Sequence, residues 1–448
     1  MLRRTFKRLI LAAAAISLAC FTASAQAQNG EYTSYSPYSI FGVGDISTPG
    51  SAYNLGMGGV GLASRNNRYL NTLNPAAVTA RDSLSFMLEF FVNNSNTLMR
   101  QKIGGETSNM VKNASNIGGF AASFPIWKSS AFMAGLAPYS STGYRYEYKE
   151  TDPNILATEG SIDYDLIGQG SLYKLFFGAG ATFWKKLSIG AQVDYIFGNY
   201  EKGFYQTFHR VPHNEVEDVY TFNLHAFVPK FGFQFEQSVG KKSKICVGGT
   251  VSLSTSLRGI IDYKQSAVGT AETIVNQSWS DTLSHDLGRI KLPTELGFGI
   301  AWRYGDKFRA EFDWSGSFWK NTGFDTFDGF GNDAGTRTFS SCNRNVFRAG
   351  IEYIPNPNDI RYYRKRITYR AGAYRINEYY TYCGNKVSST GVTFGMTLPV
   401  FRWYNGLSFA FDAGRRGSLD GGMVQETYFK ISVGVNLYDI WFQKPRYD

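Results

Sequence analysis

The sequence is poor in charge and, beyond its first 25 residues, contains no long hydrophobic run. Asp, Glu, Lys and Arg make up only 18% of the 448 residues, whereas Phe, Trp and Tyr make up 16%. A membrane-spanning helix needs about 20 predominantly apolar residues, so a helical membrane bundle is excluded. The aromatic content also excludes an intrinsically disordered chain. Low charge, 48 glycines and many aromatic residues are together typical of an all-β transmembrane barrel.

The N-terminus has the pattern of a secretory signal peptide. A basic stretch from Arg3 to Arg8 precedes the apolar stretch Leu9–Phe21, which is too short to span a bilayer. Small residues then alternate from Ala23 to Ala27, as cleavage sites require. We therefore expect residues 1–27 to be removed and the rest to reach the outer membrane of a Gram-negative bacterium.

Fourteen later segments have the length and the two-residue alternation of membrane-spanning strands. They are 84–95, 117–127, 131–144, 170–183, 187–200, 218–236, 244–262, 292–304, 308–320, 344–354, 366–376, 389–400, 405–414 and 427–441. Long and short connections alternate between them, which is typical of long outside loops and short periplasmic turns. An even strand number also places both chain ends in the periplasm. We therefore predict a 14-stranded antiparallel barrel over residues 84–448.

In the second half of the chain, the charged residues within each of the stretches 308–315, 347–353, 367–374 and 429–437 share one parity. In 308–320, for example, Phe308 and Phe312 alternate with Arg309, Glu311 and Asp313. A lipid-facing Arg or Lys costs about 2–4 kcal/mol at the bilayer midplane, so the charged parity must face the lumen. The main lumen charges expected are Arg303, Arg309, Glu311, Asp313, Arg348, Glu352, Arg370 and Lys430. Their mixed signs favour an ion-pair network that holds a plug; the alternative is that an Arg or Lys binds the carboxylate of an acidic ligand.

Residues 28–83 lack a strand pattern and are predicted to form a leader and a hatch that fills the lumen. A barrel of 14 strands is wide enough to need water or a plug inside it. The segment contains Gly56, Gly58, Gly59 and Gly61, followed by Asn74-Pro75-Ala76. The spacing G-x-G-x-x-G binds dinucleotides only between a strand and a helix, so we interpret these glycines as sites of close packing against the wall.

No motif for catalysis, metal binding or nucleic-acid binding is present. The sequence lacks Gly-x-Ser-x-Gly, and nothing places a His beside a nucleophile. We therefore expect no enzyme activity, no catalytic residue, no cofactor and no metal site. No basic cluster suggests a nucleic acid. The partners expected are outer-membrane lipid, a hydrophobic small-molecule ligand and other outer-membrane proteins.

Pro138 and Pro229 fall in the interior of predicted strands, away from their ends. Proline cannot donate to the ladder of a closed barrel, so it marks a bulge or kink, and a kink can open a gap in the wall. Pro229 coincides with a change of parity in 218–236, from Phe222 and Leu224 to Phe231 and Phe233, and Pro138 interrupts 131–144. We predict a lateral opening at Pro138, Tyr139 and Gly143.

The order of these motifs resembles the long-chain fatty acid transporters of the outer membrane, the FadL/TodX type. The run Gly56–Ala63 followed by Asn74-Pro75-Ala76 looks like the hatch of that family, and Leu136–Tyr139 looks like its kinked third strand. Arg348–Tyr353 with Arg370–Tyr374 is similar to another of its signatures. The leader Tyr35–Gly42 is similar to that of members from Bacteroidetes-type bacteria.

This resemblance implies a barrel through which hydrophobic molecules cross: ligand is captured outside, moves to a site near the hatch and leaves sideways at the third strand. The segment 145–169 has few apolar residues for a capture groove. Some relatives carry no substrate and serve as barrel subunits of larger secretion or assembly complexes, which is the alternative function.

The strand order also predicts a disulfide between Cys342 and Cys383. Cys342 precedes strand 344–354 and Cys383 follows strand 366–376, so both lie at the outside ends of one antiparallel pair. Exported proteins form disulfides in an oxidising compartment. Cys246, on the inner parity of 244–262, is expected to remain a free thiol.

Overall fold

The computed structural model describes residues 34–440, except 83, 104, 128, 210–214, 269–272, 283–289, 326–329, 331–337 and 402–404. The predicted signal peptide, residues 1–27, lies outside the described residues. No helix in the described ranges is long and apolar enough to cross a membrane.

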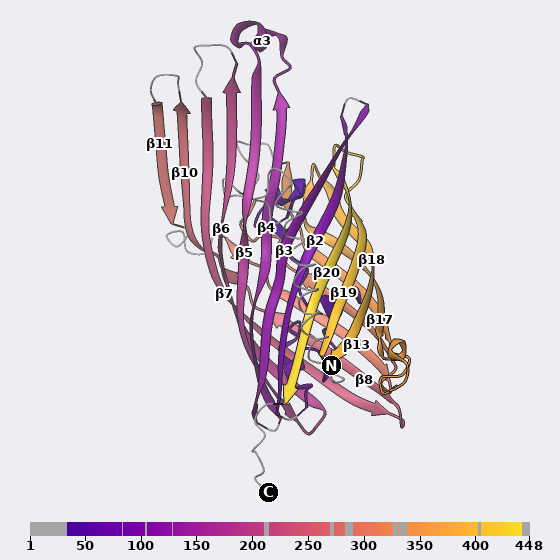
Figure 1. Ribbon diagram of the computed structural model, residues 1–448. Helices are drawn as coiled ribbons and strands as arrows, with labels where there is room; N and C mark the ends of the chain where they lie inside the picture. The colour runs from indigo at the N-terminus through magenta and orange to yellow at the C-terminus, as the bar shows by residue number, and fades with distance from the viewer. Residues whose placement is uncertain are drawn as a thin grey trace.

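The wall is a closed antiparallel barrel of 14 strands (Figure 1). Successive strands pair along the chain, and β20 pairs with β2 to close the barrel. The wall strands are β2 Ser85–Ile103, β3 Glu106–Trp127, β4 Ser130–Lys149, β5 Ile162–Phe183, β6 Leu187–Phe208, β7 Glu215–Val239, β8 Ser243–Ser252, β13 Glu295–Tyr304, β14 Phe308–Ser317, β16 Arg344–Tyr353, β17 Thr368–Tyr382, β18 Asn385–Phe401, β19 Asn405–Arg416 and β20 Gln425–Ile440. The predicted fold class is confirmed, and each predicted strand overlaps one of these.

Several strands continue well past their predicted outer ends, and the predicted loops are correspondingly shorter. The predicted 21-residue connection after the first strand is a hairpin in which Ile103 faces Glu106. Between β17 and β18 the turn consists of Cys383 and Gly384, both with positive φ (46° and 78°), as a tight hairpin turn requires. These extensions lack the continuous outward apolar face of a lipid-exposed strand, so lipid-driven alternation does not reveal them.

The predicted strand 244–262 is divided in two. β8 ends at Ser252, and β10 Arg258–Val268 begins after a break. The lower half of β7 pairs with β8 and its upper half with β10, which also pairs with β11 Thr273–Thr282. A two-stranded sheet of β9 Thr255–Ser256 and β12 Lys291–Leu292 lies beside this fork.

The predicted kink at Pro229 is wrong. The pairing of β6 with β7 passes through Pro229 without a register shift, and Phe222, Leu224 and Ala226 are buried inside the barrel. Pro229 lies at the fork where β7 changes its partner from β10 to β8, and its carbonyl accepts a hydrogen bond from the N–H of Leu253 (3.0 Å). At a fork, a missing donor does not interrupt a continuous ladder.

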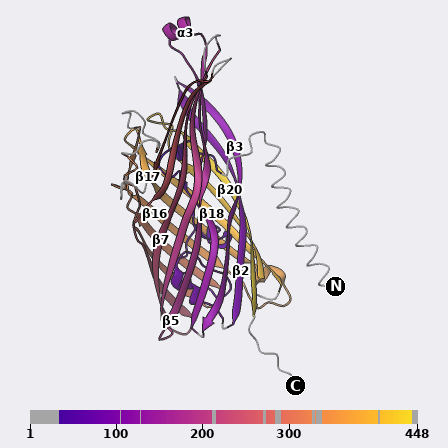
Figure 2. The same ribbon diagram turned by 90° about the vertical axis from the view of Figure 1, so that its left-hand side faces the viewer.

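The two ends of the barrel differ strongly. Ser85 and Ile440 pair with each other, so the chain enters and leaves the wall at one end, where short turns such as 184–186 and 240–242 also lie. We assign this end to the periplasm, because outer-membrane barrels keep their short turns there. At the other end β4–β7, β10 and β11 form a tall sheet that carries α3 Pro153–Glu159 at its tip (Figures 1 and 2).

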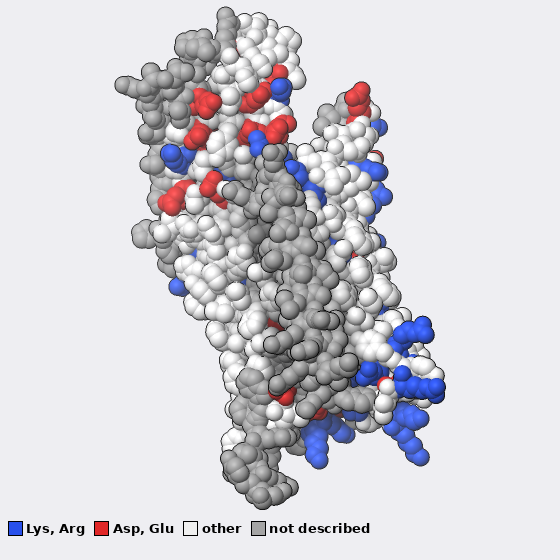
Figure 3. Space-filling model, in the orientation of Figure 1, with Lys and Arg blue, Asp and Glu red and all other residues white. Residues whose placement is uncertain are grey.

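An apolar band covers the outward face of the wall. Six of its aromatic members, each on a different strand, are between 42% and 49% exposed: Phe177, Phe233, Phe298, Phe312, Phe347 and Phe394. Figure 3 shows that Lys and Arg gather toward the end with the short turns, whereas Asp and Glu gather on the tall sheet. An exposed apolar belt between two polar ends is the surface of a protein that sits in a bilayer.

The N-terminal segment, residues 34–82, lies inside this wall. It contains η1 Pro37–Ile40, β1 Asp45–Ile46, α2 Ala52–Leu55 and η2 Pro75–Thr79. Most of its side chains are buried, and η2 packs against β5, β6 and β7.

Two short elements lie in the connections between wall strands. β15 Phe339–Ser341, which precedes β16, pairs with the outer end of β17. η3 Tyr363–Arg366 forms part of the longest periplasmic connection, between β16 and β17.

Candidate functional site: the filled lumen and a break in the wall

The wall is interrupted between β3 and β4. Their ladder begins at Trp127 and Ser130, ends where Phe120 faces Leu136, and does not continue above this point. β3 nevertheless extends up to Glu106, and β4 up to Lys149. Figure 1 shows the upper parts of these two strands leaning apart. We call this interruption the seam.

Two irregularities in the backbone produce the seam. In β4 the register with β5 shifts between Pro138 and Ser140, so Tyr139 is an extra residue. In β3 the register with β2 shifts at Gly118, where a Cβ would lie inside the ring of Phe91. Bulges bend a strand and increase its twist. Because the two bulges face each other, the strands diverge instead of pairing.

The edge of β4 above the break is occupied by the N-terminal segment. β1 pairs with Ser140 and Ser141. The Ser36 N–H donates to the Gly143 carbonyl (2.8 Å), and the Ser47 N–H donates to the Tyr139 carbonyl (2.9 Å). The residues predicted for the lateral opening, Pro138, Tyr139 and Gly143, thus all lie at the seam, and two of them bind the N-terminal segment.

The glycines predicted for the hatch approach the backbone of the wall closely. A Cβ on Gly56 would lie 2.8 Å from the Cα of Gly395, so only glycine fits on either side of this contact. Gly58 has φ +75° and donates its N–H to Thr393 (2.7 Å), and Gly59 lies beside the Arg348 side chain. The N–H of Gly61 donates to the Asp313 carboxylate (2.7 Å).

The Asn74-Pro75-Ala76 motif fixes the second half of the segment. Asn74 precedes η2, and its side chain accepts a hydrogen bond from the Ala76 N–H (3.0 Å). The same side chain donates to the carbonyls of Leu62 (2.8 Å) and of Phe233 in β7 (3.1 Å). The motif therefore ties η2 both to the glycine-rich stretch and to the wall.

All eight predicted lumen charges point inward, and most of them contact the segment. Asp313 also accepts from the Leu62 N–H (2.9 Å). Arg309 donates to Ser64 (2.9 Å) and to the Tyr53 hydroxyl, and forms ion pairs with Glu352 (3.3 Å) and Glu311 (3.2 Å).

Three more of the predicted lumen charges, Arg370, Arg303 and Lys430, also point inward. Arg370 stacks over the Tyr53 ring at 4.2 Å, and Arg303 lines a small cavity together with Arg65 of the segment. Lys430 differs, because it lies over Tyr428 and faces Asp412 across the sheet. The ion-pair network anchors the segment to the wall.

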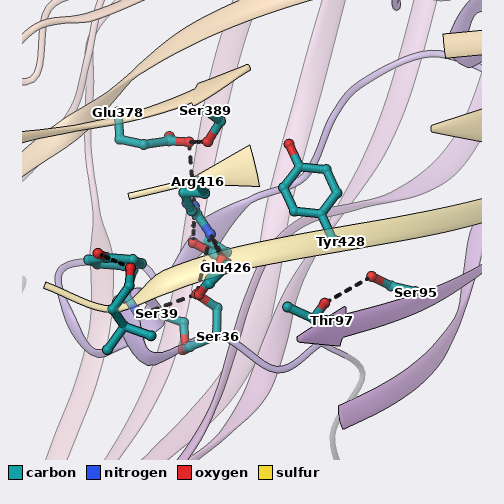
Figure 4. Close-up of polar contacts among 12 residues, drawn as sticks. Ser36, Ser39, Ser95, Thr97, Glu378, Ser389, Arg416, Glu426 and Tyr428 are labelled. Carbon is teal, nitrogen blue, oxygen red and sulfur yellow. Dashed lines mark hydrogen bonds and ion pairs between the residues drawn. The ribbon is translucent and has the colours of Figure 1, made fainter. Parts of the chain in front are cut away.

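A second charged cluster was not predicted from the sequence. Arg416 of β19 forms ion pairs with Asp45 (2.6 Å), Glu378 (3.5 Å) and Glu426 (3.4 Å), and the Ser36 hydroxyl donates to Glu426 (2.5 Å) (Figure 4). Glu378, Arg416 and Glu426 all lie just beyond the predicted ends of their strands. Longer predicted strands would have placed all three on the inner parity.

Besides the small cavity at Arg65 and Arg303, three cavities with volumes of 210, 50 and 140 Å³ lie around the segment. Pro138 lines all three, so they meet at the seam. The 210 Å³ cavity lies beside the Arg416 cluster and is rich in polar residues. The 140 Å³ cavity combines apolar Leu62, Leu73 and Val228 with the charged side chains of Lys230 and Arg348.

An aromatic cluster fills the outer mouth of the barrel. Trp319, Phe324 and Phe330, from the connection after β14, are fully buried. Trp319 packs on Tyr379 at 4.4 Å between ring centroids, and Phe330 packs on Phe222 at 5.0 Å.

The N-terminal segment takes part in this cluster. Tyr38 packs on Tyr380 at 6.0 Å and donates its hydroxyl to the Val424 carbonyl (2.6 Å), and burial raises the pKa of Tyr38 well above its usual range. Among the described residues, the aromatic cluster therefore closes the outer end of the lumen. The three cavities meet at the seam in the side of the wall.

The predicted disulfide is wrong. Cys246, Cys342 and Cys383 are free thiols. The Cys342 N–H bonds to the Tyr379 carbonyl (2.7 Å) and the Cys383 N–H to the Thr338 carbonyl (2.7 Å), because β15 continues the ladder as far as Phe339 and Tyr382. The two cysteines are thus four residues apart in register, about 13 Å along a strand, beyond the reach of a disulfide.

The fold, the apolar belt and the filled lumen define an outer-membrane β-barrel with the FadL-type architecture. The chain belongs to the BamG family, whose model matches residues 6–448. None of the curated proteins matches the sequence.

Solved structures of similar fold include the toluene transporter TodX of Pseudomonas putida, at 15% identity and TM-score 0.60, with 90% of this chain and 100% of that chain covered. The Ralstonia pickettii toluene transporter TbuX is similar at 16% identity and TM-score 0.57, covering 86% and 97%. A Pseudomonas aeruginosa FadL homologue has 12% identity and TM-score 0.52, covering 88% and 99%. Identities this low establish a shared fold and leave the ligand open.

Proposed function

We propose that this protein is an outer-membrane channel for hydrophobic small molecules similar to fatty acids, which leave the lumen sideways through the seam. The observation that carries the proposal is the convergence of all three cavities at Pro138, where the ladder of β3 with β4 ends. The solved proteins of similar fold include toluene transporters and a monoaromatic hydrocarbon channel.

The 140 Å³ cavity is the best candidate for a ligand site. An amphipathic acid would place its carboxylate toward Arg348, whose Nη2 atom is buried and makes no hydrogen bond to the described residues. Its apolar part would lie toward Leu62, Leu73 and Val228. Typical ligand pockets are about 300–1,000 Å³, so the N-terminal segment must shift to admit a long chain. The segment then acts as the gate.

A disulfide that locks the base of the seam tests this route. A Cβ on Gly119 would lie 3.5 Å from the Cβ of Ala137, which is within the range for a disulfide. We propose Gly119→Cys with Ala137→Cys, in a background where Cys246, Cys342 and Cys383 are replaced by Ser. Ala122→Cys with Ala134→Cys, an opposed pair inside the intact ladder, is the matched control.

Uptake of radiolabelled oleate is measured in cells that lack their own fatty acid transporter. We expect oxidation to stop uptake through the seam-locked variant, reduction to restore it, and neither treatment to affect the control pair. The comparison of oxidised with reduced protein removes any effect of strain at Gly119, whose φ is +153°. Equal uptake in both redox states would contradict the lateral route.

The alternative is a barrel subunit of a larger outer-membrane complex, which a different observation favours. The outer mouth is closed by the aromatic cluster, and the 210 Å³ cavity is lined by Asp45, Glu378, Arg416 and Glu426. Transfer of an apolar ligand past such groups is unfavourable. Purification in a mild detergent, followed by mass measurement of the intact particle, separates the two functions: a subunit would copurify with stoichiometric partners, and a channel would not.

A further inference from the structure

The two edges of the seam are unequal. Above the break, β4 carries β1 and the hydrogen bonds from Ser36 and Ser47 along its edge. β3 continues upward through Thr107–Ala114 with β2 on one side only, because its ladder with β4 ends at Phe120. This stretch contacts the N-terminal segment through a side chain: the Lys112 ammonium lies 5.1 Å from the centre of the Tyr35 ring.

An exposed strand edge is a template for pairing with another chain, and barrels ordinarily abolish such edges. Folded proteins protect exposed edges with Pro, inward-pointing charges or very short strands. The stretch Thr107–Ala114 contains no Pro, is eight residues long and belongs to a 22-residue strand. Its one charged side chain, Lys112, points to the inner side, where it lies over the Tyr35 ring of the N-terminal segment. The edge of β3 is therefore available for strand pairing, and the edge of β4 shows that this seam already accepts an added strand.

The side chains along the β3 edge indicate the kind of strand that would fit. Lys112 and Ala114 line the polar 210 Å³ cavity on the inner side. On the two faces of the strand, Met110 is 46% exposed and Val111 is 68% exposed, so apolar surface lies beside the edge on both sides. An incoming strand would place one set of alternate residues toward the polar cavity and the other set outward.

We propose that the β3 edge of the seam binds an extended segment of another polypeptide by strand addition, and that this segment alternates polar and apolar residues as an outer-membrane strand does. Main-chain hydrogen bonds supply affinity in this mode, and alternate side chains supply specificity. The proposal does not depend on the channel function, because the edge lies above the point where the cavities meet.

Three synthetic peptides test strand addition against the purified full chain in lipid nanodiscs. The probe has the sequence of β20, Gln425–Ile440, which alternates as the proposal requires. Adjacent residues of a strand direct their N–H groups to opposite edges. N-methylation of Ile431, Val433 and Val435 therefore blocks one edge, and N-methylation of Lys430 and Ser432 blocks the other. A third peptide carries both sets.

We expect the unmodified peptide to bind and the doubly methylated peptide to bind at least about tenfold more weakly, since several main-chain hydrogen bonds are lost. At least one of the singly methylated peptides should retain affinity. Equal binding of the unmodified and doubly methylated peptides would overturn the proposal, and so would the absence of binding by the unmodified peptide.

Amide hydrogen exchange locates the binding site in the same samples. Binding should slow exchange within 107–114 of β3 and leave exchange within β11, the edge strand of the tall sheet, unchanged. Slower exchange at β11 alone would contradict the assignment to the seam. Lipid acyl chains cannot accept hydrogen bonds from amides, so protection of 107–114 without peptide would show that the edge is closed and would also overturn the proposal.

Discussion

Arg416 is the residue whose loss should most weaken the attachment of the N-terminal segment. Its guanidinium lies among Asp45, Glu378 and Glu426, and its side chain is only 11% exposed. Asp45 belongs to the N-terminal segment, whereas Glu378 and Glu426 belong to the wall. Arg416→Met removes the positive charge, keeps an unbranched apolar side chain, and leaves three carboxylates together without this partner.

Removing one partner of a buried ion pair typically destabilises a protein by about 3–5 kcal/mol. Here the destabilisation should fall on the contact between the segment and the wall, because the strand ladder of β19 does not involve the side chain of Arg416. A change of about 3 kcal/mol raises the population of the detached segment about 150-fold. We expect Arg416→Met to keep a folded barrel and to show frequent opening events in planar bilayers.

Arg415→Met is the matched control, because Arg415 is the neighbouring residue on the outward parity of the same strand. The two variants lose the same charge from adjacent positions. The conductance of single channels is compared in the same lipid at the same ionic strength. If Arg416→Met opens no more often than Arg415→Met and the unmodified protein, the argument that this cluster holds the segment is refuted.

Three further predictions follow from the same structure. Deletion of residues 28–75 should leave an assembled, heat-modifiable barrel with increased permeability to small sugars in liposome-swelling assays, and unchanged swelling would argue against a plug. Gly395→Val should displace Gly56 and destabilise the packing of the segment by about 1–3 kcal/mol, seen as faster proteolysis within 34–82, whereas Ala413→Val on the outward face should leave proteolysis unchanged. Thiol labelling without reductant should modify all of Cys246, Cys342 and Cys383 after denaturation. In the folded protein, exposed Cys383 should react fastest and buried Cys246 slowest. If only Cys246 reacts in the denatured chain, Cys342 and Cys383 form a disulfide after all.

The parts of the fold that lipid constrains could be predicted from the sequence. In β14 the alternation of Phe308 and Phe312 with Arg309 and Asp313 follows from the high free energy of a charge in lipid, and the structure places these charges inward. The inner position of Arg348 and Glu352 follows from the same reasoning. Within the membrane, apolar residues toward lipid must alternate with polar residues toward the lumen. A periodicity of two therefore identifies both the strand and the side chains that face the lumen.

Outside the membrane this constraint is absent, and the predictions become unreliable there. The β2–β3 hairpin continues through Asn94, Asn96 and Asn113, which are polar and hydrogen-bond one another on the outward face. No continuous apolar face marks such strands, so their ends were placed too early. The Arg416 cluster was missed, and the register of Cys342 and Cys383 was misjudged, for this same reason.

The two prolines show a different limit. Both remove a backbone donor, but Pro138 lies beside a bulge where β4 separates from β3, whereas Pro229 lies where β7 passes from one partner to another. The sequence identifies the missing donor. The consequence depends on which strand lies opposite, and that is a property of the assembled sheet.

The most direct test of this account is a comparison of two distances across the seam in a bilayer. Spin labels at Phe124 and Phe132 report a rung inside the ladder. Labels at Val111 and Arg145 report outward positions that would face each other about nine residues above the last rung, Phe120 with Leu136, if the ladder continued in register. Opposed residues in an antiparallel ladder have Cα atoms about 4.5–5.5 Å apart. The account predicts a short distance for the lower pair and a clearly longer one for the upper pair; equally short distances for both pairs would contradict an open seam.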